Sequence, residues 1–158
     1  MTYIIPFPQL NKTNISTAGG KGANLGEMIA AGFPVPPGFV LTTGAYDAFV
    51  QANGVQRQII ELARTVSVDD LHSSETVSKK IRALFMQGEI ADDLAAEITN
   101  AYRQLTQTTG STVAVRSSAT AEDLPTASFA GQQDTYLNIR GEDALLDAVK
   151  KCWASLWT

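Results

Sequence analysis

The amino-acid sequence predicts an α+β fold in which short strands flank a helical middle segment. Three observations support this prediction. Residues 39–41 form a short apolar run, apolar residues recur with helical spacing between about residues 55 and 107, and two further short runs follow at 113–115 and 134–139. With 158 residues, of which 44% are hydrophobic, the chain is long enough for one ordinary domain with its own core.

Composition and charge exclude several classes of function. The net charge of −4 argues against a general nucleic-acid surface, and no apolar run approaches the length of a membrane span. The start of the chain has neither a basic segment nor a long apolar core, so we expect no signal peptide. The single cysteine, Cys152, fits a reducing, cytoplasmic setting, and we expect it to be a buried structural thiol. His72 is the only histidine, and we expect it in a loop or cap, not in a metal or catalytic site.

The first predicted helix lies within residues 18–32. Leu25, Met28 and Ile29 have the i, i+3, i+4 spacing of one helical face. Prolines in the segment 33–38 then impose an extended path, which leads into the predicted strand.

Glycines crowd the start of this helix and make it a candidate anion site. Gly19, Gly20 and Gly22 lie at or just before its first turn, where free N–H groups and the helix dipole favour a negative charge. Lys21 adds a mobile positive charge. The segment is no P-loop, because Gly22 follows Lys21 where Ser or Thr is required, and no dinucleotide fingerprint, because Gly26 comes one residue too late. The alternative interpretation is a glycine-rich helix start with a lysine in solvent.

Five further helical segments are predicted after the strand. Thr43 is the expected N-cap of a helix over about residues 44–51, which Asn53 and Gly54 should end. The later segments are helices over 55–65 and 74–87, an apolar stripe over 90–105 before a polar connection at 106–112, and a last helix over 141–157. The residues expected to face inward are Ile59, Leu62, Val66, Val77, Ile81, Leu84, Phe85, Ile90, Leu94, Ile98, Tyr102, Leu105, Leu145, Val149, Cys152, Trp153 and Leu156. We interpret the two long middle stripes as core packing and not as a cofactor site.

The second candidate site follows a short apolar run near the end of the chain. Residues 113–115 predict the end of a buried strand, with Arg116 at its carboxyl end, where ligands bind in open α/β sheets. Arginine offers a rigid fork of donors that matches phosphate. Ser117, Ser118 and Thr120 add hydroxyl groups and backbone donors.

The residues after this site are predicted to form a loop and a strand. Residues 122–125 have turn character, Gly131 allows close backbone approach to a ligand, and residues 134–139 alternate as in a half-buried strand. An arginine at the end of a strand is often solvated or paired at the surface, here with an acidic residue of the turn. The residues alone leave both the phosphate site and the surface ion pair open.

Four linked motifs carry a family resemblance. They are Gly19-Gly-Lys-Gly-Ala-Asn-Leu-Gly-Glu-Met, Val35-Pro-Pro-Gly-Phe-Val-Leu-Thr-Thr, Val115-Arg-Ser-Ser-Ala-Thr-Ala-Glu-Asp and Ser128-Phe-Ala-Gly-Gln-Gln-Asp-Thr-Tyr-Leu-Asn. In this order and spacing they closely resemble the nucleotide-binding start of the phosphoenolpyruvate synthase and pyruvate phosphate dikinase family, which rifamycin phosphotransferases share.

The resemblance implies an ATP-grasp fold, of which residues 1–158 are a single partial domain, the N-terminal subdomain, with a helical insertion at about 55–107. It implies that Lys21 and Arg116 contact the phosphates of ATP and are the catalytic candidates. It also implies that the remaining residues of the nucleotide pocket are Gly20, Gly131, Gln132 and Thr135.

The resemblance further implies a transferase of the kinase type, acting as part of a longer protein. ATP phosphorylates a histidine on a separate phosphohistidine domain, and this histidine passes the phosphoryl group to pyruvate. Mg²⁺ is expected, with ligands outside this chain, and no nucleic-acid or membrane partner is expected. We expect the isolated chain to be inactive. The alternatives are the same region of a rifamycin phosphotransferase, with a rifamycin acceptor, or a stand-alone binding module without catalysis.

Overall fold

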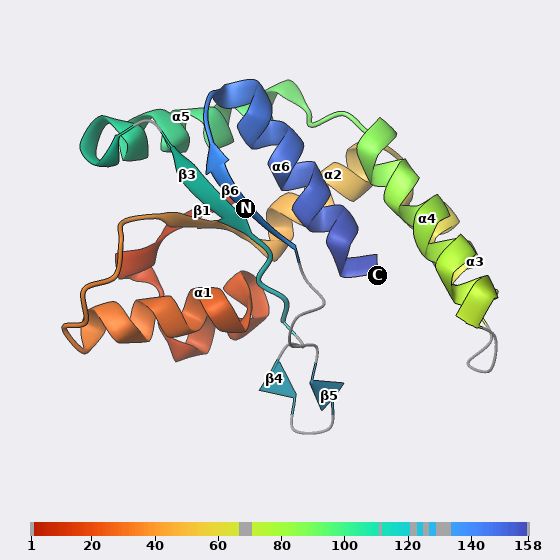
Figure 1. Ribbon diagram of the computed structural model, residues 1–158, viewed down its shortest axis with the longest axis horizontal. Coiled ribbons are helices and arrows are strands. Elements are labelled where there is room, and N and C mark those ends of the chain that lie inside the picture. The colour runs from red at the N-terminus through yellow and green to blue at the C-terminus, as the bar shows by residue number, and fades with distance from the viewer. Residues whose placement is uncertain are drawn as a thin grey trace.

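The computed structural model describes residues 2–66, 71–110, 112–120, 123–124, 127–128 and 134–157. Strands flank a helical middle, so the predicted α+β class is confirmed (Figure 1). The helices are α1 (Ile15–Ala30), α2 (Thr43–Ala52), α3 (Gln56–Arg64), α4 (Leu71–Gln87), α5 (Asp92–Thr109) and α6 (Glu142–Ala154). The strands are β1 (Ile4–Pro6), β2 (Phe39–Leu41), β3 (Val113–Arg116), β4 (Asp123–Leu124), β5 (Ala127–Ser128) and β6 (Thr135–Ile139). Short 3-10 turns occur at η1 (Phe7–Gln9), η2 (Lys12–Asn14) and η3 (Ser155–Trp157).

Within the described residues the strands form three two-stranded antiparallel sheets, β1–β2, β3–β6 and β4–β5. The strand β1 has no counterpart in the sequence prediction, and it pairs with β2 in the register Ile4 with Leu41. Because these sheets are antiparallel, the rule that ligands bind at the carboxyl ends of parallel strands does not apply to Arg116. The position of Arg116 is set by strand pairing instead. Arg116 is the last residue of β3 and lies directly opposite Thr135, the first residue of β6.

A β-bulge interrupts the alternation that was predicted for residues 134–139. Val113 pairs with Ile139 and Val115 with Tyr136, so β6 holds one more residue than β3 between the two pairs. Asn138 adopts a φ of 56° at this irregularity. The extra residue breaks the alternation, so Leu137 is 67% exposed while Tyr136 is half-buried. The prediction that 113–115 is a buried strand was also wrong, because only alternate residues of β3 are half-buried.

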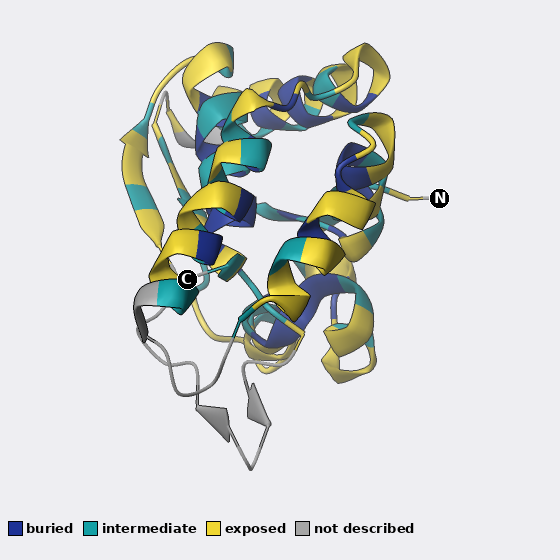
Figure 2. Ribbon diagram, turned by 90° about the vertical axis from the view of Figure 1, so that its right-hand side faces the viewer, coloured by how far each residue is buried: buried dark blue, intermediate teal, exposed yellow. Residues whose placement is uncertain are grey.

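The core lies between the helices and is built on aromatic side chains. Figure 2 shows buried residues on the inner sides of the helices. The ring of Phe49 in α2 stacks on Phe85 of α4 at 5.7 Å between centroids and contacts Trp153 of α6 at 5.0 Å. Most of the residues expected inward are buried in this cluster or packed against it: Ile59, Leu62, Val66, Val77, Ile81, Leu84, Phe85, Ile90, Leu94, Ile98, Tyr102, Leu145, Val149 and Trp153. Helical periodicity therefore identified the core correctly in this part of the chain.

The end of the last helix departs from its prediction. The α-helix stops at Ala154 and continues as the 3-10 turn η3, which has fewer residues per turn. The change of phase turns Leu156 outward, where it is 40% exposed, so its predicted inward position was wrong. Trp157 packs against the core instead, and its indole N–H donates to the hydroxyl of Tyr46 at 3.2 Å.

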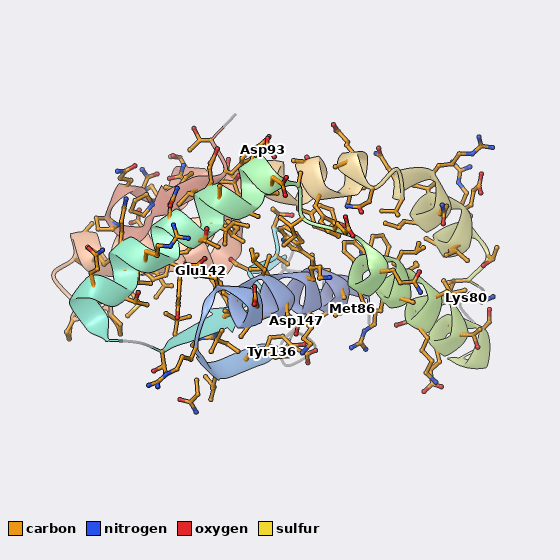
Figure 3. The ribbon with its side chains drawn as sticks, turned by 90° about the horizontal axis from the view of Figure 1, so that it is seen from above. Lys80, Met86, Asp93, Tyr136, Glu142 and Asp147 are labelled. Carbon is orange, nitrogen blue, oxygen red and sulfur yellow. The ribbon has the colours of Figure 1, made fainter. Side chains whose placement is uncertain are left out.

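Hydrogen bonds join the helices at their ends. Lys150 of α6 donates to the carbonyls of Met86 and Gly88, both at 3.1 Å, and so caps the C-terminus of α4. At the other end of α6, Arg103 of α5 forms a two-pronged ion pair with Glu142, with N–O distances of 2.6 and 2.8 Å. Figure 3 shows Glu142 at the start of α6, beside α5.

Three predicted boundaries need correction. Thr42 is the N-cap residue of α2 in place of Thr43, and its hydroxyl donates to the carbonyl of Thr2 at 2.9 Å. The helix α5 runs on to Thr109, so the predicted polar connection at 106–112 is partly helical. His72 belongs to α4 and not to a loop.

None of the helices in the described ranges has the length and apolar character needed to cross a membrane.

Candidate functional site

The helix α1 is broken at the glycine pair that the sequence marks out. Gly19 adopts a φ of 72° and a ψ of 169°, which divides the helix into a first turn and a longer second part. A left-handed φ of this kind favours glycine, which has no Cβ to clash with the backbone. A Cβ on Gly19 would lie only 2.2 Å from the carbonyl oxygen of Ser118. The kink thus depends on glycine and brings the loop after β3 against the helix backbone.

Three hydrogen bonds join this kink to the loop after β3. The N–H of Gly22 donates to Oγ of Ser118 at 3.0 Å, and the Ser118 hydroxyl donates to the carbonyl of Ala18 at 2.8 Å. The N–H of Gly20 donates to the carbonyl of Ala119 at 3.1 Å. The two candidate clusters of the sequence, 96 residues apart at Gly22 and Ser118, therefore lie in direct contact.

The glycines of α1 form its packing face. The residues of α1 that are buried are all small: Ala18, Gly19, Gly20, Gly22, Ala23 and Gly26. A Cβ on Gly22 would lie 2.9 Å from a methyl group of Val40 in β2, and one on Gly26 would lie 2.1 Å from the carbonyl oxygen of Leu10. Met28, one of the apolar residues whose spacing predicted the helix, is 43% exposed. These glycines thus permit close approach between backbone segments.

The expectation of free N–H groups at the start of the helix was wrong for two of the glycines. The N–H groups of Gly20 and Gly22 are both donated to the loop after β3. An anion at this turn must therefore be held mainly by side chains and by other backbone groups.

The two basic residues of the candidate site belong to the joined segments. Lys21 is half-buried and lies between the two glycines whose N–H groups bond to the loop. Arg116 is exposed and lies two residues before Ser118, with the exposed Thr135 opposite it in β6. The structure thus brings the segments of Lys21, Arg116 and Thr135 together, while Gly131 and Gln132 lie outside the described residues.

Two groups near the β3–β6 sheet have strongly shifted pKa values. Burial raises the pKa of the Cys152 thiol to about 12, and the charge of Asp134 adds to this shift. Burial also raises the pKa of Tyr136 to about 12, helped by the hydrogen bond that its hydroxyl donates to Asp134 at 2.9 Å. Tyr136 lies under α6 (Figure 3), where the Lys151 ammonium group is 5.9 Å from its ring centre. Both groups stay protonated at neutral pH, and the expectation that Cys152 is a buried thiol is confirmed.

Two surface hollows among the described residues lie elsewhere. One is lined by residues of α3 and another by residues of α2, α3 and Trp157, and neither includes Lys21 or Arg116. The hollow on α3 has two arginines, but Arg57 is already paired with Glu61 at 2.8 Å. Neither hollow contains a residue of the motifs that predict phosphate binding, so the glycine–serine junction stays the candidate site.

Comparison with known proteins identifies the family. Residues 15–158 match the family described as pyruvate phosphate dikinase, AMP/ATP-binding domain, and the chain belongs to this family. The chain is 48% identical, over 98% of its length, to a probable phosphoenolpyruvate synthase of Methanothermobacter thermautotrophicus, and covers 23% of that protein. It is 41% identical, over 99% of its length, to the phosphoenolpyruvate synthase of Pyrococcus furiosus, covering 23% of it. For the phosphoenolpyruvate synthase of Helicobacter pylori the identity is 46% over 100% of the chain, which covers 20% of that protein.

These matches confirm the resemblance inferred from the motifs. The chain spans about a fifth of the length of these three relatives.

Sequence reasoning nevertheless missed the part played by Ser118, which it grouped with other hydroxyl residues of the loop. The only local signal was the position of Ser118 two residues after Arg116, since its hydrogen-bond partners are distant in the sequence.

Proposed function

We propose that this chain is the ATP-phosphate-binding segment of a phosphoenolpyruvate synthase-like phosphotransferase. The observation that carries the proposal is the contact between the Lys21 segment and the Arg116 segment, held by Ser118 and Ala119 in a member of an AMP/ATP-binding domain family. In the proposed arrangement residues 1–158 are the N-terminal subdomain of an ATP-grasp fold, and the segment 55–107 is its helical insertion.

The proposed work of the site is positioning and charge neutralisation, which dominate catalysis of phosphoryl transfer. Lys21 supplies a point charge to the ATP phosphates, and the guanidinium group of Arg116 binds phosphate oxygens through its planar fork. Thr135, Gly131 and Gln132 line the pocket beside them. Because the N–H of Gly20 is donated to Ala119, Gly20 contributes close backbone approach instead of a hydrogen bond.

The proposed reaction moves a phosphoryl group twice. In the first transfer a histidine nitrogen of another domain attacks the β-phosphorus of ATP and the P–O bond to AMP breaks; water then cleaves the link between the β- and γ-phosphates, which releases phosphate and leaves a phosphohistidine. In the second transfer the N–P bond breaks as the enolate oxygen of pyruvate, formed by loss of a methyl proton, takes the phosphoryl group. The described residues contain no cluster of three or more His, Cys, Asp or Glu side chains that fits a metal ion. The proposed ligands of Mg²⁺ lie in other parts of the longer protein. The proposed location of that protein is the cytoplasm.

The test is an assay of the full-length protein that carries this chain. We expect ATP, pyruvate and water to give AMP, phosphate and phosphoenolpyruvate. Formation of AMP with rifampicin and not with pyruvate would assign the chain to a rifamycin phosphotransferase. Absence of phosphoryl transfer to either acceptor would contradict the proposal and favour a binding module without catalysis.

A further inference from the structure

The hydroxyl of Ser118 occupies an unusual position in the broken helix. In a regular α-helix the N–H of residue 22 would donate directly to the carbonyl of residue 18. Here Oγ of Ser118 accepts from the N–H of Gly22 and donates to the carbonyl of Ala18, so it bridges the two groups that an unbroken helix would pair. A side chain inserted into the hydrogen-bond ladder is a recognised cause of a helix kink.

The hydrogen-bonding capacity of Ser118 restricts what else it can do. A serine hydroxyl has one proton to donate, and that of Ser118 is donated to Ala18. Phosphate oxygens carrying negative charge need donors, so in this arrangement Ser118 has no proton left for a phosphate. Its position in a hydroxyl-rich loop next to Arg116 is therefore misleading as evidence for direct phosphate contact.

The junction is also closely packed around Ser118. A Cβ on Gly19 would lie 2.4 Å from Oγ of Ser118, so only glycine fits there. Lys21 lies inside the bridged turn, one residue before Gly22. Arg116 is the last residue of β3 and lies two residues before Ser118. The same hydroxyl thus ties the backbone of one basic residue to the segment of the other.

We propose that Ser118 is a positioning residue, whose hydroxyl holds the kink of α1 open and so places Lys21 relative to Arg116. The inference rests on the proposed function, because it concerns how the phosphate-binding residues of that site are placed. Ser118 acts through Lys21 in this scheme and does not contact the nucleotide.

The experiment measures ATP affinity by calorimetry in the full-length protein. We expect Ser118→Ala to weaken ATP binding about tenfold, as loss of two hydrogen bonds that hold the turn would do. The KM for pyruvate should stay unchanged, because only the nucleotide site is loosened. Thr43→Ala is the matched control: it removes a hydroxyl that donates to another α1 carbonyl, that of Ser16 at 3.3 Å, without bridging the kink. An unchanged ATP affinity in Ser118→Ala would overturn the proposal.

A double-mutant cycle separates positioning from direct contact. If Ser118 acts through Lys21, Ser118→Ala should cause no further loss of ATP affinity once Lys21→Ala is present. Losses that simply add would show that Ser118 binds the nucleotide on its own and would overturn the proposal. Should Ser118→Ala fail to fold, Ser118→Cys carries the same cycle, because the somewhat larger thiol still fills the position but forms weaker hydrogen bonds.

The two levels of inference fail separately. If Lys21→Ala and Arg116→Ala leave ATP affinity unchanged, the proposed phosphate site itself is wrong. If both weaken binding while Ser118→Ala does not, the phosphate site stands and only the role of Ser118 is rejected.

Discussion

The helical body of the molecule and its kinked first helix are packed in different ways. In the body, large apolar side chains such as Phe49, Phe85 and Trp153 fill the space between helices. In α1 the buried face consists of glycine and alanine, and Ser118, which accepts from Gly22 and donates to Ala18, holds it in place. The spacing of apolar residues therefore predicts packing only where large side chains fill the space between elements. It does not predict packing where backbone segments approach each other closely.

The largest expected effect is on activity. Lys21→Ala and Arg116→Ala should each lower ATP-dependent AMP formation by roughly 10³-fold, because each removes a charge that stabilises the transferring phosphate. The measurement is turnover in the full-length protein. Lys12→Ala and Arg57→Ala are suitable controls, since both side chains are exposed and neither belongs to the joined segments. Normal turnover in Lys21→Ala would show that the kinked first helix differs from the helical body in packing only and does not contribute to phosphate binding.

The next effect tests the packing of the two regions. Phe85→Ala should destabilise the fold by about 4 kcal/mol, because it empties a fully buried position in the aromatic cluster. Met28→Ala, in the apolar stripe of α1, should cost under about 1 kcal/mol, because Met28 is 43% exposed. Urea unfolding gives both values. Equal losses would mean that the stripe of α1 is buried in solution.

Substitutions at two glycines test the close approach of the backbone segments at the kink. Gly19→Ala should cost about 3 kcal/mol, because the new Cβ would combine a left-handed φ with a clash against Ser118. Gly32→Ala is the matched comparison: its φ is also positive, at 82°, but a Cβ there would meet nothing within 4 Å. We expect it to cost about 1 kcal/mol. Similar losses of unfolding free energy in the two variants would show that the left-handed φ alone, and not the close contact with Ser118, requires glycine at residue 19.

The smallest effect concerns pH. Because burial holds the pKa of Cys152 near 12, above its ordinary value of 9.0, stability should be full below about pH 9 and fall as the pH rises toward 12. Cys152→Ala should reduce this fall between pH 8 and 10, measured by urea unfolding at each pH. Tyr136→Phe serves as the comparison, since Tyr136 titrates from an ordinary value of 10.0. An identical slope in Cys152→Ala would show that the thiol is not the cause.

The sequence predicted the helical body well because its signals are local. The stripes of α4 and α5 lie at helical spacing, and the buried positions match them. It failed where a small irregularity reset the pattern, as at the bulge beside Asn138 or the 3-10 turn that exposes Leu156. It also missed β1, because three residues ending in a proline carry too little pattern to predict a strand.

Motifs in the sequence were sufficient to name the candidate site and the family. Lys21 and Arg116 stood out because one follows a glycine pair at a helix start and the other ends a strand before a hydroxyl-rich loop, and the motifs around them carry the resemblance to the matched family. Their contact with phosphate stays a prediction. Only the tertiary structure decided that the two segments meet, that Gly20 and Gly22 donate to the loop, and that Ser118 bridges the kink. The reason is physical: periodicity and motifs are properties of neighbouring residues, whereas these hydrogen bonds join groups about a hundred residues apart that meet only in the folded chain.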